Sequence, residues 1–118
     1  MLETLRLEIG GFFDGIKEIH ISTTDGVVHA EVKSMFQPEK QRSFTLGDVA
    51  SAEWLSALEA IHINRWRSRF EPPNPVLDGE QWEMDYKVAG KRCRHFRGDN
   101  AYPENWQQFL HLLETLGV

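Results

Sequence analysis

Cys93 and His95 are the residues whose types and spacing could support covalent chemistry. They lie two residues apart in a segment with strand periodicity, so their side chains would share one face of a strand. Neighbouring arginines would favour a thiolate, which is the nucleophilic form of cysteine. However, the strand register predicted below turns both side chains toward the core, where buried thiols and hydrogen-bonded histidines are common. We therefore predict no catalytic or metal-binding role for this pair.

The remaining histidines are scattered over different predicted elements: His20, His29, His62 and His111. Acid–base chemistry needs groups within hydrogen-bond reach of each other, which this spacing does not indicate. GxSxG, HExxH, P-loop and GxGxxG motifs are absent, and no Cys/His cluster has the spacing of zinc ligands. The sequence predicts a protein that is not an enzyme and that holds no metal and no cofactor.

Arginine and aromatic residues are interleaved in residues 65–70 and 91–97, which together form a basic band. This composition is common at protein-binding hot spots and where nucleic-acid bases stack. Trp66 lies between two of these arginines and outside the apolar stripes of the predicted helices, so we predict an exposed binding anchor there. The alternative is that the arginines pair with acidic residues from the first half of the chain. Four arginines would extend the predicted binding surface: Arg65, Arg67, Arg92 and Arg94.

Charge is unevenly distributed along the chain. Thirteen basic and eighteen acidic residues give a net charge of −5, and residues 1–60 hold ten acids against five bases. Residues 61–118 hold eight of each, and all eight bases lie between positions 65 and 97. Proteins that bind duplex nucleic acid are usually basic overall, so nucleic acid is a disfavoured partner and a charged protein is favoured.

Chain length and hydropathy favour one domain over residues 1–118. The 118 residues are 41% hydrophobic and 26% charged, which is sufficient for a packed core without metal. The single cysteine cannot form an internal disulfide. No run approaches the roughly 20 apolar residues that span a bilayer, and the first residues do not resemble a secretory signal. We expect a cytoplasmic protein with no membrane partner.

Alternating apolar residues predict three antiparallel strands at the start of the chain. Residues 5–13 and 16–23 keep the same parity only across an odd-length loop, so we predict a three-residue connection, Phe13-Asp14-Gly15, with Gly15 left-handed. The next connection must be even, and Asp25-Gly26 is predicted to form a two-residue type I′ turn. The register that follows pairs Ile21 with Ala30 and Ile19 with Val32.

A fourth strand is predicted over residues 41–46, and three-to-four-residue spacing of apolar positions predicts a helix over 51–61. Ser51 and Asp48 are both candidate caps for that helix. A proline-rich loop over 70–79 precedes a last hairpin, for which Ala89-Gly90 is predicted as a two-residue turn. That register pairs Tyr86 with Cys93, Met84 with His95, and Asp85 with Arg94.

The last element is a predicted helix that starts at Pro103 and buries a stripe of apolar residues from Trp106 to Leu116. The predicted order is four strands, a helix, two strands and a helix. This order favours an α+β fold, with an antiparallel sheet of about six strands and both helices packed on one face. The other face of such a sheet stays open, and a partner could bind there.

Two segments near the end of the chain carry a recognisable signature: Asp78-Gly79 with Trp82, and Gly-Asp-Asn-Ala-Tyr-Pro-Glu-Asn-Trp over 98–106. This pattern resembles a family of small bacterial proteins that carry D-G-x-x-W, a strand pair, and G-x-N-A-Y-P-E-N-[WF] before a last helix. The resemblance covers residues 76–113 and implies no particular activity. The same residues also have a structural interpretation, in which Asn100 or its neighbour bonds backbone donors and Tyr102 anchors the loop.

We expect a protein-binding module, most concretely an immunity-type or inhibitor protein that neutralises a cognate toxin or effector. The grounds are the small size, the acidic first half, the absence of catalytic motifs and the open sheet face. Acidic inhibitors associate faster with basic partners through electrostatic steering. The expected contacts are Glu18 and Glu31, with Trp66 as the anchor.

The alternative is a small enzyme or nucleic-acid-processing protein that uses Cys93, His95 and the basic band. It predicts that Arg92, Arg94 and Arg97 line one cleft, and that a histidine lies within reach of Cys93 or of a carboxylate. A homo-oligomer formed through an exposed sheet edge is a third alternative.

Overall fold

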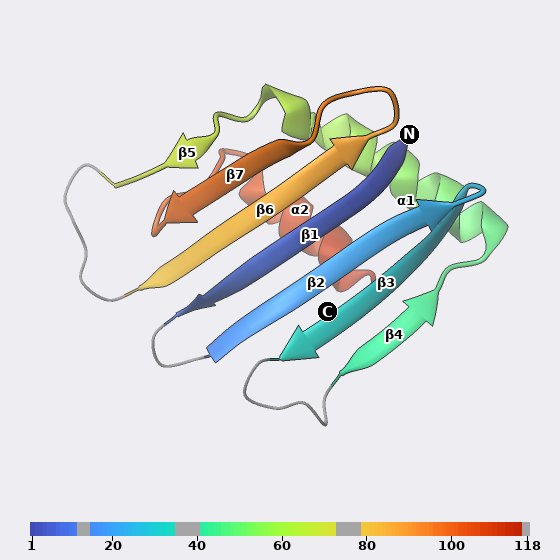
Figure 1. Ribbon diagram of the computed structural model, residues 1–118, viewed down its shortest axis with the longest axis horizontal. Coiled ribbons are helices and arrows are strands. Elements are labelled where there is room, and N and C mark those ends of the chain that lie inside the picture. Colours follow the sequence, from blue (N-terminus) through green and yellow to red (C-terminus); the bar gives the residue numbers. More distant parts are fainter. Residues whose placement is uncertain (12–14, 35–40, 73–78, 117–118) are drawn as a thin grey trace.

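The computed structural model describes residues 1–11, 15–34, 41–72 and 79–116. In these ranges a seven-stranded sheet is backed by two helices on one face (Figure 1). The strand order across the sheet is β4-β3-β2-β1-β6-β7-β5. The strands are β1 (Leu2–Gly11), β2 (Gly15–Thr24), β3 (Val27–Ser34), β4 (Arg42–Thr45), β5 (Arg69–Phe70), β6 (Glu80–Val88) and β7 (Arg94–Asp99). The helices are α1 (Asp48–Ile61) and α2 (Trp106–Glu114), with a short 3₁₀ turn, η2 (Ile63–Arg65), after α1.

The predicted α+β class and the packing of both helices on one face are confirmed, but the sheet has seven strands rather than about six. The additional strand is β5, which pairs in parallel with β7, whereas every other strand pair is antiparallel. Only two residues long, β5 carries no periodicity that a sequence could reveal. No helix in the described ranges is long and apolar enough to cross a membrane.

The predicted register of β2 with β3 is confirmed, whereas the register of β1 with β2 differs by two residues from the one that the predicted connection implied. Ile21 lies opposite Ala30, and Ile19 lies opposite Val32 and Leu7. The β1–β2 connection has an odd number of residues and Gly15 is left-handed (φ +77°), both as predicted. The predicted bounds are wrong, because Gly15 already belongs to β2, where it pairs with Gly11. Phe13 and Asp14 lie outside the described residues. At the next turn, Asp25 and Gly26 have φ values of +53° and +78°, as a type I′ turn requires.

Replacing Gly26 by alanine should lower the free energy of unfolding by about 1–2 kcal/mol, because a Cβ makes the left-handed conformation unfavourable. No other atom lies within 4 Å of the position that this Cβ would take, so the cost is that of the backbone alone. Urea denaturation measures it. Gly26→Asn is the control, because asparagine tolerates the left-handed conformation and should lose less. Equal losses in the two variants would contradict the assigned turn.

The ends of the helices differ from the predictions. Helix α1 starts at Asp48, and its N-cap is Gly47, which makes no side-chain cap. Ser51 is instead fully buried, where its Oγ accepts a hydrogen bond from the Val28 amide (2.9 Å) and so ties α1 to β3. Helix α2 starts at Trp106 rather than at Pro103, because Pro103 lies in the turn that precedes it.

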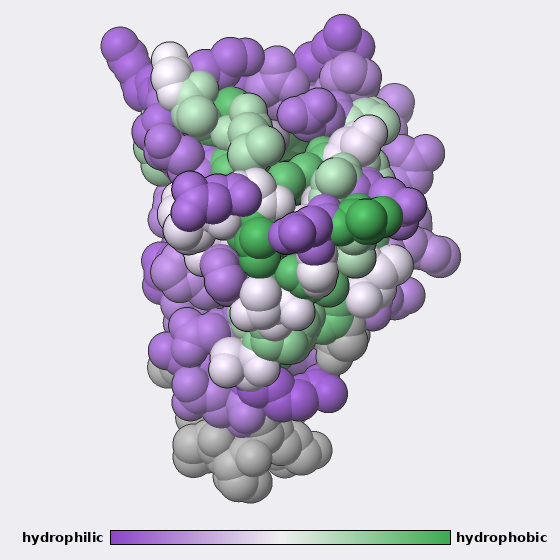
Figure 2. All heavy atoms as spheres, turned by 90° about the vertical axis from the view of Figure 1, so that its right-hand side faces the viewer, coloured by the Kyte–Doolittle hydropathy of each residue, from purple (hydrophilic) through white to green (hydrophobic). Residues whose placement is uncertain are grey.

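The core lies between the helices and the sheet. Its centre consists of side chains on alternate strand positions, such as Leu5, Leu7 and Ile21, packed against Leu58 and Phe109 from the two helices. Figure 2 shows the molecule from the side, where an apolar band lies between two hydrophilic zones. One zone is the uncovered face of the sheet and the other is the outer surface of the helices. The uncovered face is therefore hydrophilic where this view shows it.

The predicted register of the last hairpin is wrong by one residue. Tyr86 pairs with Arg94 rather than with Cys93, and Asp85 pairs with His95 rather than with Arg94. The connection between the strands spans five residues, 89–93, instead of two. A one-residue shift turns every side chain to the opposite face. Phe96 is consequently fully buried, while Cys93 and His95 are exposed.

Candidate functional site on the uncovered sheet face

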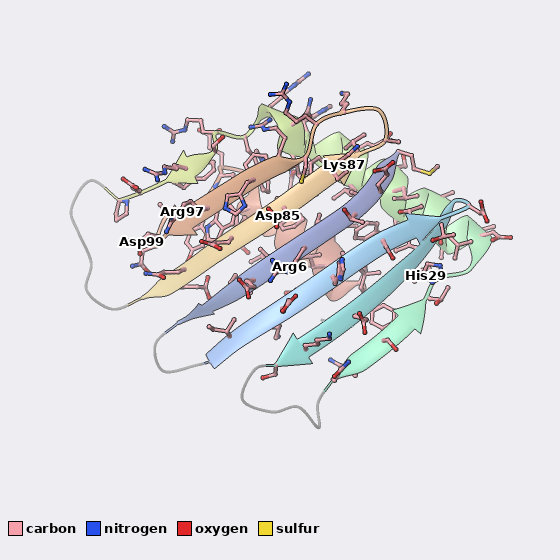
Figure 3. All side chains as sticks on the ribbon, in the orientation of Figure 1. Arg6, His29, Asp85, Lys87, Arg97 and Asp99 are labelled. Atoms are coloured by element: carbon pink, nitrogen blue, oxygen red, sulfur yellow. The ribbon has the colours of Figure 1, made fainter. Side chains whose placement is uncertain are left out.

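Alternate residues of the strands point away from the helices and form rows across the uncovered face. Figure 3 shows Arg6, Asp85, Lys87, Arg97 and Asp99 on this face, in front of the sheet. Strand pairing places the members of each row opposite one another on neighbouring strands. One row reads, from β3 to β5, Lys33, Glu18, Glu8, Glu83, Arg97 and Arg69. The adjacent row reads Glu31, His20, Arg6, Asp85 and His95.

The first row contains three glutamates side by side, Glu18, Glu8 and Glu83, which we call the glutamate row. Like charges directly opposite one another destabilise a sheet. Arg6 compensates for part of this repulsion: its Nε donates to Glu18 Oε1 (2.9 Å), and a second guanidinium nitrogen lies 3.5 Å from Glu8 Oε1. The hydrogen bond and the charge of Glu18 raise the pKa of Arg6, so this cation persists. Glu83 forms no ion pair with any residue in the described ranges.

Beside the glutamate row, Asp85 and His95 form a hydrogen-bonded pair. The Nδ1 of His95 donates to Asp85 Oδ1 at 2.7 Å, and both side chains are exposed. Arg6 lies 3.7 Å from the other carboxylate oxygen of Asp85. An aspartate in this position fixes the orientation of the imidazole. The prediction that a histidine of this region lies within reach of a carboxylate is thus confirmed, whereas the prediction that Cys93 and His95 face the core is wrong.

A hollow of about 320 Å³ opens on the same face, where β1, β6, β7 and β5 lie side by side. Its lining combines two arginines, Arg69 and Arg97, with four acidic residues: Glu8, Glu71, Glu83 and Asp99. The two arginines are opposite each other on parallel strands, and neither forms an ion pair within the part of the chain that the structure describes. The hollow therefore offers both charges to a ligand.

The prediction that Trp66 is an exposed anchor is wrong, because only 8% of the residue is exposed. The turn η2 brings the indole beneath the sheet, where its Nε1 donates to Asn105 Oδ1 (2.8 Å). Its ring packs edge-on against Phe96 and Phe109, with centroids 5.9 and 5.5 Å away. The predicted burial of Trp106 is confirmed, and Trp54 and Trp82 are buried as well.

The arginines of the basic band do not share one surface. Arg94 donates to the carbonyls of Asn64 (2.9 Å) and Trp66 (3.1 Å) and thereby holds the η2 segment. Arg92 and Arg94 line a hollow beside α1, while Arg97 lines the one on the uncovered face, so the single cleft expected by the enzyme alternative is not formed. No arginine of the band forms an ion pair with an acid in residues 1–11, 15–34, 41–72 or 79–116. The four predicted binding arginines are Arg65, Arg67, Arg92 and Arg94, of which all but the half-buried Arg94 are exposed.

Of the predicted acidic contacts, Glu18 and Glu31 both lie on the uncovered face. Glu18 is paired with Arg6, and Glu31 is half-buried opposite His20. Sequence reasoning missed Glu8 and Glu83, which complete the glutamate row. Their alternation within a strand was visible, but only the long-range pairing of β1 with β6 brings them together.

The signature residues bond to each other rather than surround a vacant site. Asn100 Oδ1 accepts a hydrogen bond from the backbone N–H of Glu80 (2.8 Å), and the backbone N–H of Asn100 donates to the Glu80 carbonyl (2.9 Å). The Tyr102 hydroxyl donates to Glu80 Oε1 (2.8 Å), and Trp82 Nε1 donates to the Ala101 carbonyl (3.0 Å). A Cβ on Gly98 would overlap the Trp82 indole. The predicted turn role of Asn100 and the anchoring role of Tyr102 are confirmed.

Burial, together with the hydrogen bond to Glu80 and its charge, raises the pKa of Tyr102 to about 12 from an ordinary value of 10.0. Folding thus favours the neutral phenol, so this contribution to stability is complete below pH 10 and is lost as the pH rises through about 12. Ultraviolet titration of the Tyr86→Phe variant observes Tyr102 alone, since the chain has two tyrosines. Glu80→Gln should lower the value. An ordinary pKa for Tyr102 in the Tyr86→Phe variant, with Glu80 in place, would contradict the Tyr102–Glu80 contact.

No protein-family model matches the chain, and no curated protein matches it in sequence. Function must therefore be inferred from the surface itself. In the described residues, no group of three or more His, Cys, Asp or Glu side chains is arranged to hold a metal ion. The distinguishing feature is the glutamate row, with the two unpaired arginines at one end of it.

Proposed function

We propose that the protein is a binding module that engages a basic protein partner through the uncovered face of its sheet, as an inhibitor or immunity-type protein does. The observation that supports this most is the glutamate row. Arg6 pairs with Glu18 and lies near Glu8, but Glu83 forms no ion pair with a described residue, so the row keeps unpaired negative charge. A lysine or arginine from a partner, inserted between Glu8 and Glu83, would relieve repulsion that folding alone leaves in place.

The arginines at the β7 end of the row would set the orientation of the partner. Arg97 and Arg69 continue the row beyond Glu83, and both line the hollow with unpaired guanidinium groups. An acidic side chain beside the basic one on the partner would complement them. Such alternating charge determines register and excludes wrong partners more than it adds affinity. The net charge of −5 would additionally accelerate encounter with a basic protein.

Affinity capture from the native host with two matched triple variants tests this proposal. The first is Glu8→Gln/Glu18→Gln/Glu83→Gln, and the second is Glu53→Gln/Glu104→Gln/Glu114→Gln, which changes the net charge equally on or beside the helices. We expect the parent and the second variant to retain one basic partner, and the first to bind it about tenfold more weakly or worse. Equal binding by both variants, or no stoichiometric partner, would contradict the proposal.

A second candidate is acid–base or nucleophilic chemistry, favoured by the Asp85–His95 hydrogen bond and by the exposure of Cys93 on the adjoining segment. If His95 assists Cys93, the thiol of the parent should react with iodoacetamide at pH 7 about tenfold faster than the thiol of His95→Gln, since thiolate content sets that rate. Equal alkylation rates would remove this candidate.

A further inference from the structure

A second hollow, also of about 320 Å³, lies away from the uncovered face, between the end of α1 and the loop that joins β6 to β7. Its floor is made of core side chains, of which Leu2 and Leu55 keep 5–6% of their surface exposed and Leu58 and Ile63 keep 1%. The volume lies at the lower end of the range for small-molecule sites. The apolar residues lining it include Leu2, Leu55, Leu58, Ile63 and Val88.

The rim of this hollow is basic on the loop side. Lys91 and Arg92 are exposed and form no ion pair with residues that the structure describes. Arg94 adds a third cation whose position is fixed, because it donates to two backbone carbonyls and its guanidinium stacks 4.7 Å from the centre of the Phe96 ring. Glu59 and His62 line the helix side. A negatively charged head group would therefore face the loop.

Tyr86 places an unused hydrogen-bond donor in the lining. The residue is only 7% exposed, and its hydroxyl forms no hydrogen bond with any described residue. Burial and the charge of Glu59 raise the pKa of Tyr86, so the phenol stays protonated at neutral pH and can donate. Solvent can reach this hydroxyl, because it is not one of the fully buried, unpaired side-chain atoms of the described residues. A bound acceptor would replace water there.

We propose that this hollow binds a small amphipathic carboxylate, with its aliphatic tail on Leu2, Leu55 and Val88 and its head group near Lys91, Arg92 and the Tyr86 hydroxyl. The apolar floor accounts for the tail, and the unpaired cations with the phenol account for the head. The ligand is a free molecule rather than a protein segment, because the hollow has the volume of a small-molecule site. This site is independent of the proposed partner surface, which lies on the opposite face.

Titration of the full ¹⁵N-labelled chain with sodium octanoate, followed by amide chemical shifts, tests the site. We expect saturable shifts confined to the last turn of α1, the end of β6 and residues 89–93. Octan-1-ol has the tail without the charge, and acetate has the charge without the tail, so both should bind more weakly than octanoate. Absence of saturable shifts, or octan-1-ol binding as tightly as octanoate, would overturn the proposal.

Two matched double variants separate the site from a general effect of charge. Lys91→Gln/Arg92→Gln should weaken octanoate binding about tenfold, because charge-assisted hydrogen bonds are lost. Lys33→Gln/Arg69→Gln removes the same charges from the uncovered face and should leave the affinity unchanged. Tyr86→Phe should weaken binding several-fold. Equal affinity in the two double variants would contradict the assignment, and thermal unfolding verifies that each variant is folded.

Discussion

Replacing Trp66 by alanine should lower the free energy of unfolding by about 3–5 kcal/mol, the range observed for large aromatic side chains removed from a core. The indole lies among four aromatic rings, and the space it leaves could not be filled by their small movements. Its ring contacts Trp82, Phe96, Trp106 and Phe109, with centroid distances from 5.5 to 6.4 Å.

Urea denaturation of Trp66→Ala and of Arg67→Ala measures this effect. Arg67 is the adjacent residue and is exposed, so its variant should change stability by less than about 1 kcal/mol. A loss at Trp66 as small as that at Arg67 would show that the indole is on the surface, as its arginine neighbours suggested. The structure would then be wrong in this region.

Replacing Asn105 by alanine should cost about 2–4 kcal/mol, because two largely buried polar groups would lose their partner. Asn105 Nδ2 donates to the Ile61 carbonyl (2.7 Å), and Asn105 Oδ1 accepts from Trp66 Nε1 (2.8 Å). One side chain thus joins the end of α1, the η2 segment and the start of α2. Asp at this position keeps the acceptor but loses the donor, so Asn105→Asp should lose the bond to Ile61 only.

A double-mutant cycle distinguishes the hydrogen bond from general packing. Trp66→Phe removes the indole donor, and in that background the Asn105→Ala change should cost less than in the parent, by about 1 kcal/mol. Additive losses, measured by denaturation, would mean that the two side chains do not interact. The Trp66–Asn105 hydrogen bond would then be excluded.

Local patterns were sufficient for the pairing of β2 with β3 and for the face on which the side chains of β1 lie, but not for the register of β1 with β2. The Asp25-Gly26 turn adopts the backbone that its residue types favour, and it alone determines the pairing of Ile19 and Ile21 with β3. The alternation of apolar residues likewise indicated that Leu5 and Leu7 of β1 face the core. The turn between β2 and β3 contains the necessary information, whereas parity alone leaves the β1–β2 register free to shift by two residues.

The last hairpin shows why the same reasoning can fail. Ala89-Gly90 resembles a tight turn, and Gly90 does adopt φ of +78°. The connection nevertheless extends over Lys91, Arg92 and Cys93, because full burial of Phe96 stabilises the fold more than a shorter loop would. Both registers place alternating residues on each face, so the sequence pattern does not choose between them. Burial of Phe96 decides the register, and it requires the helices that cover this part of the sheet.

The candidate site and the position of Trp66 depend on contacts distant in sequence. Glu8 meets Glu83 only because β1, and not a neighbouring hairpin, pairs with β6. Trp66 is buried only because Asn105 and Phe109 arrive from α2. Composition marked both regions as charged and aromatic, but it could not indicate that the acids would face outward and the tryptophan inward.

The most direct test of the proposed function is the footprint of the captured partner on the ¹⁵N-labelled protein, recorded by amide chemical shifts. We expect the largest shifts along β2, β1 and β6, centred on Glu18, Glu8 and Glu83, and weakening as salt increases. Shifts confined to α1 and α2, or a footprint that salt does not weaken, would contradict binding through the glutamate row.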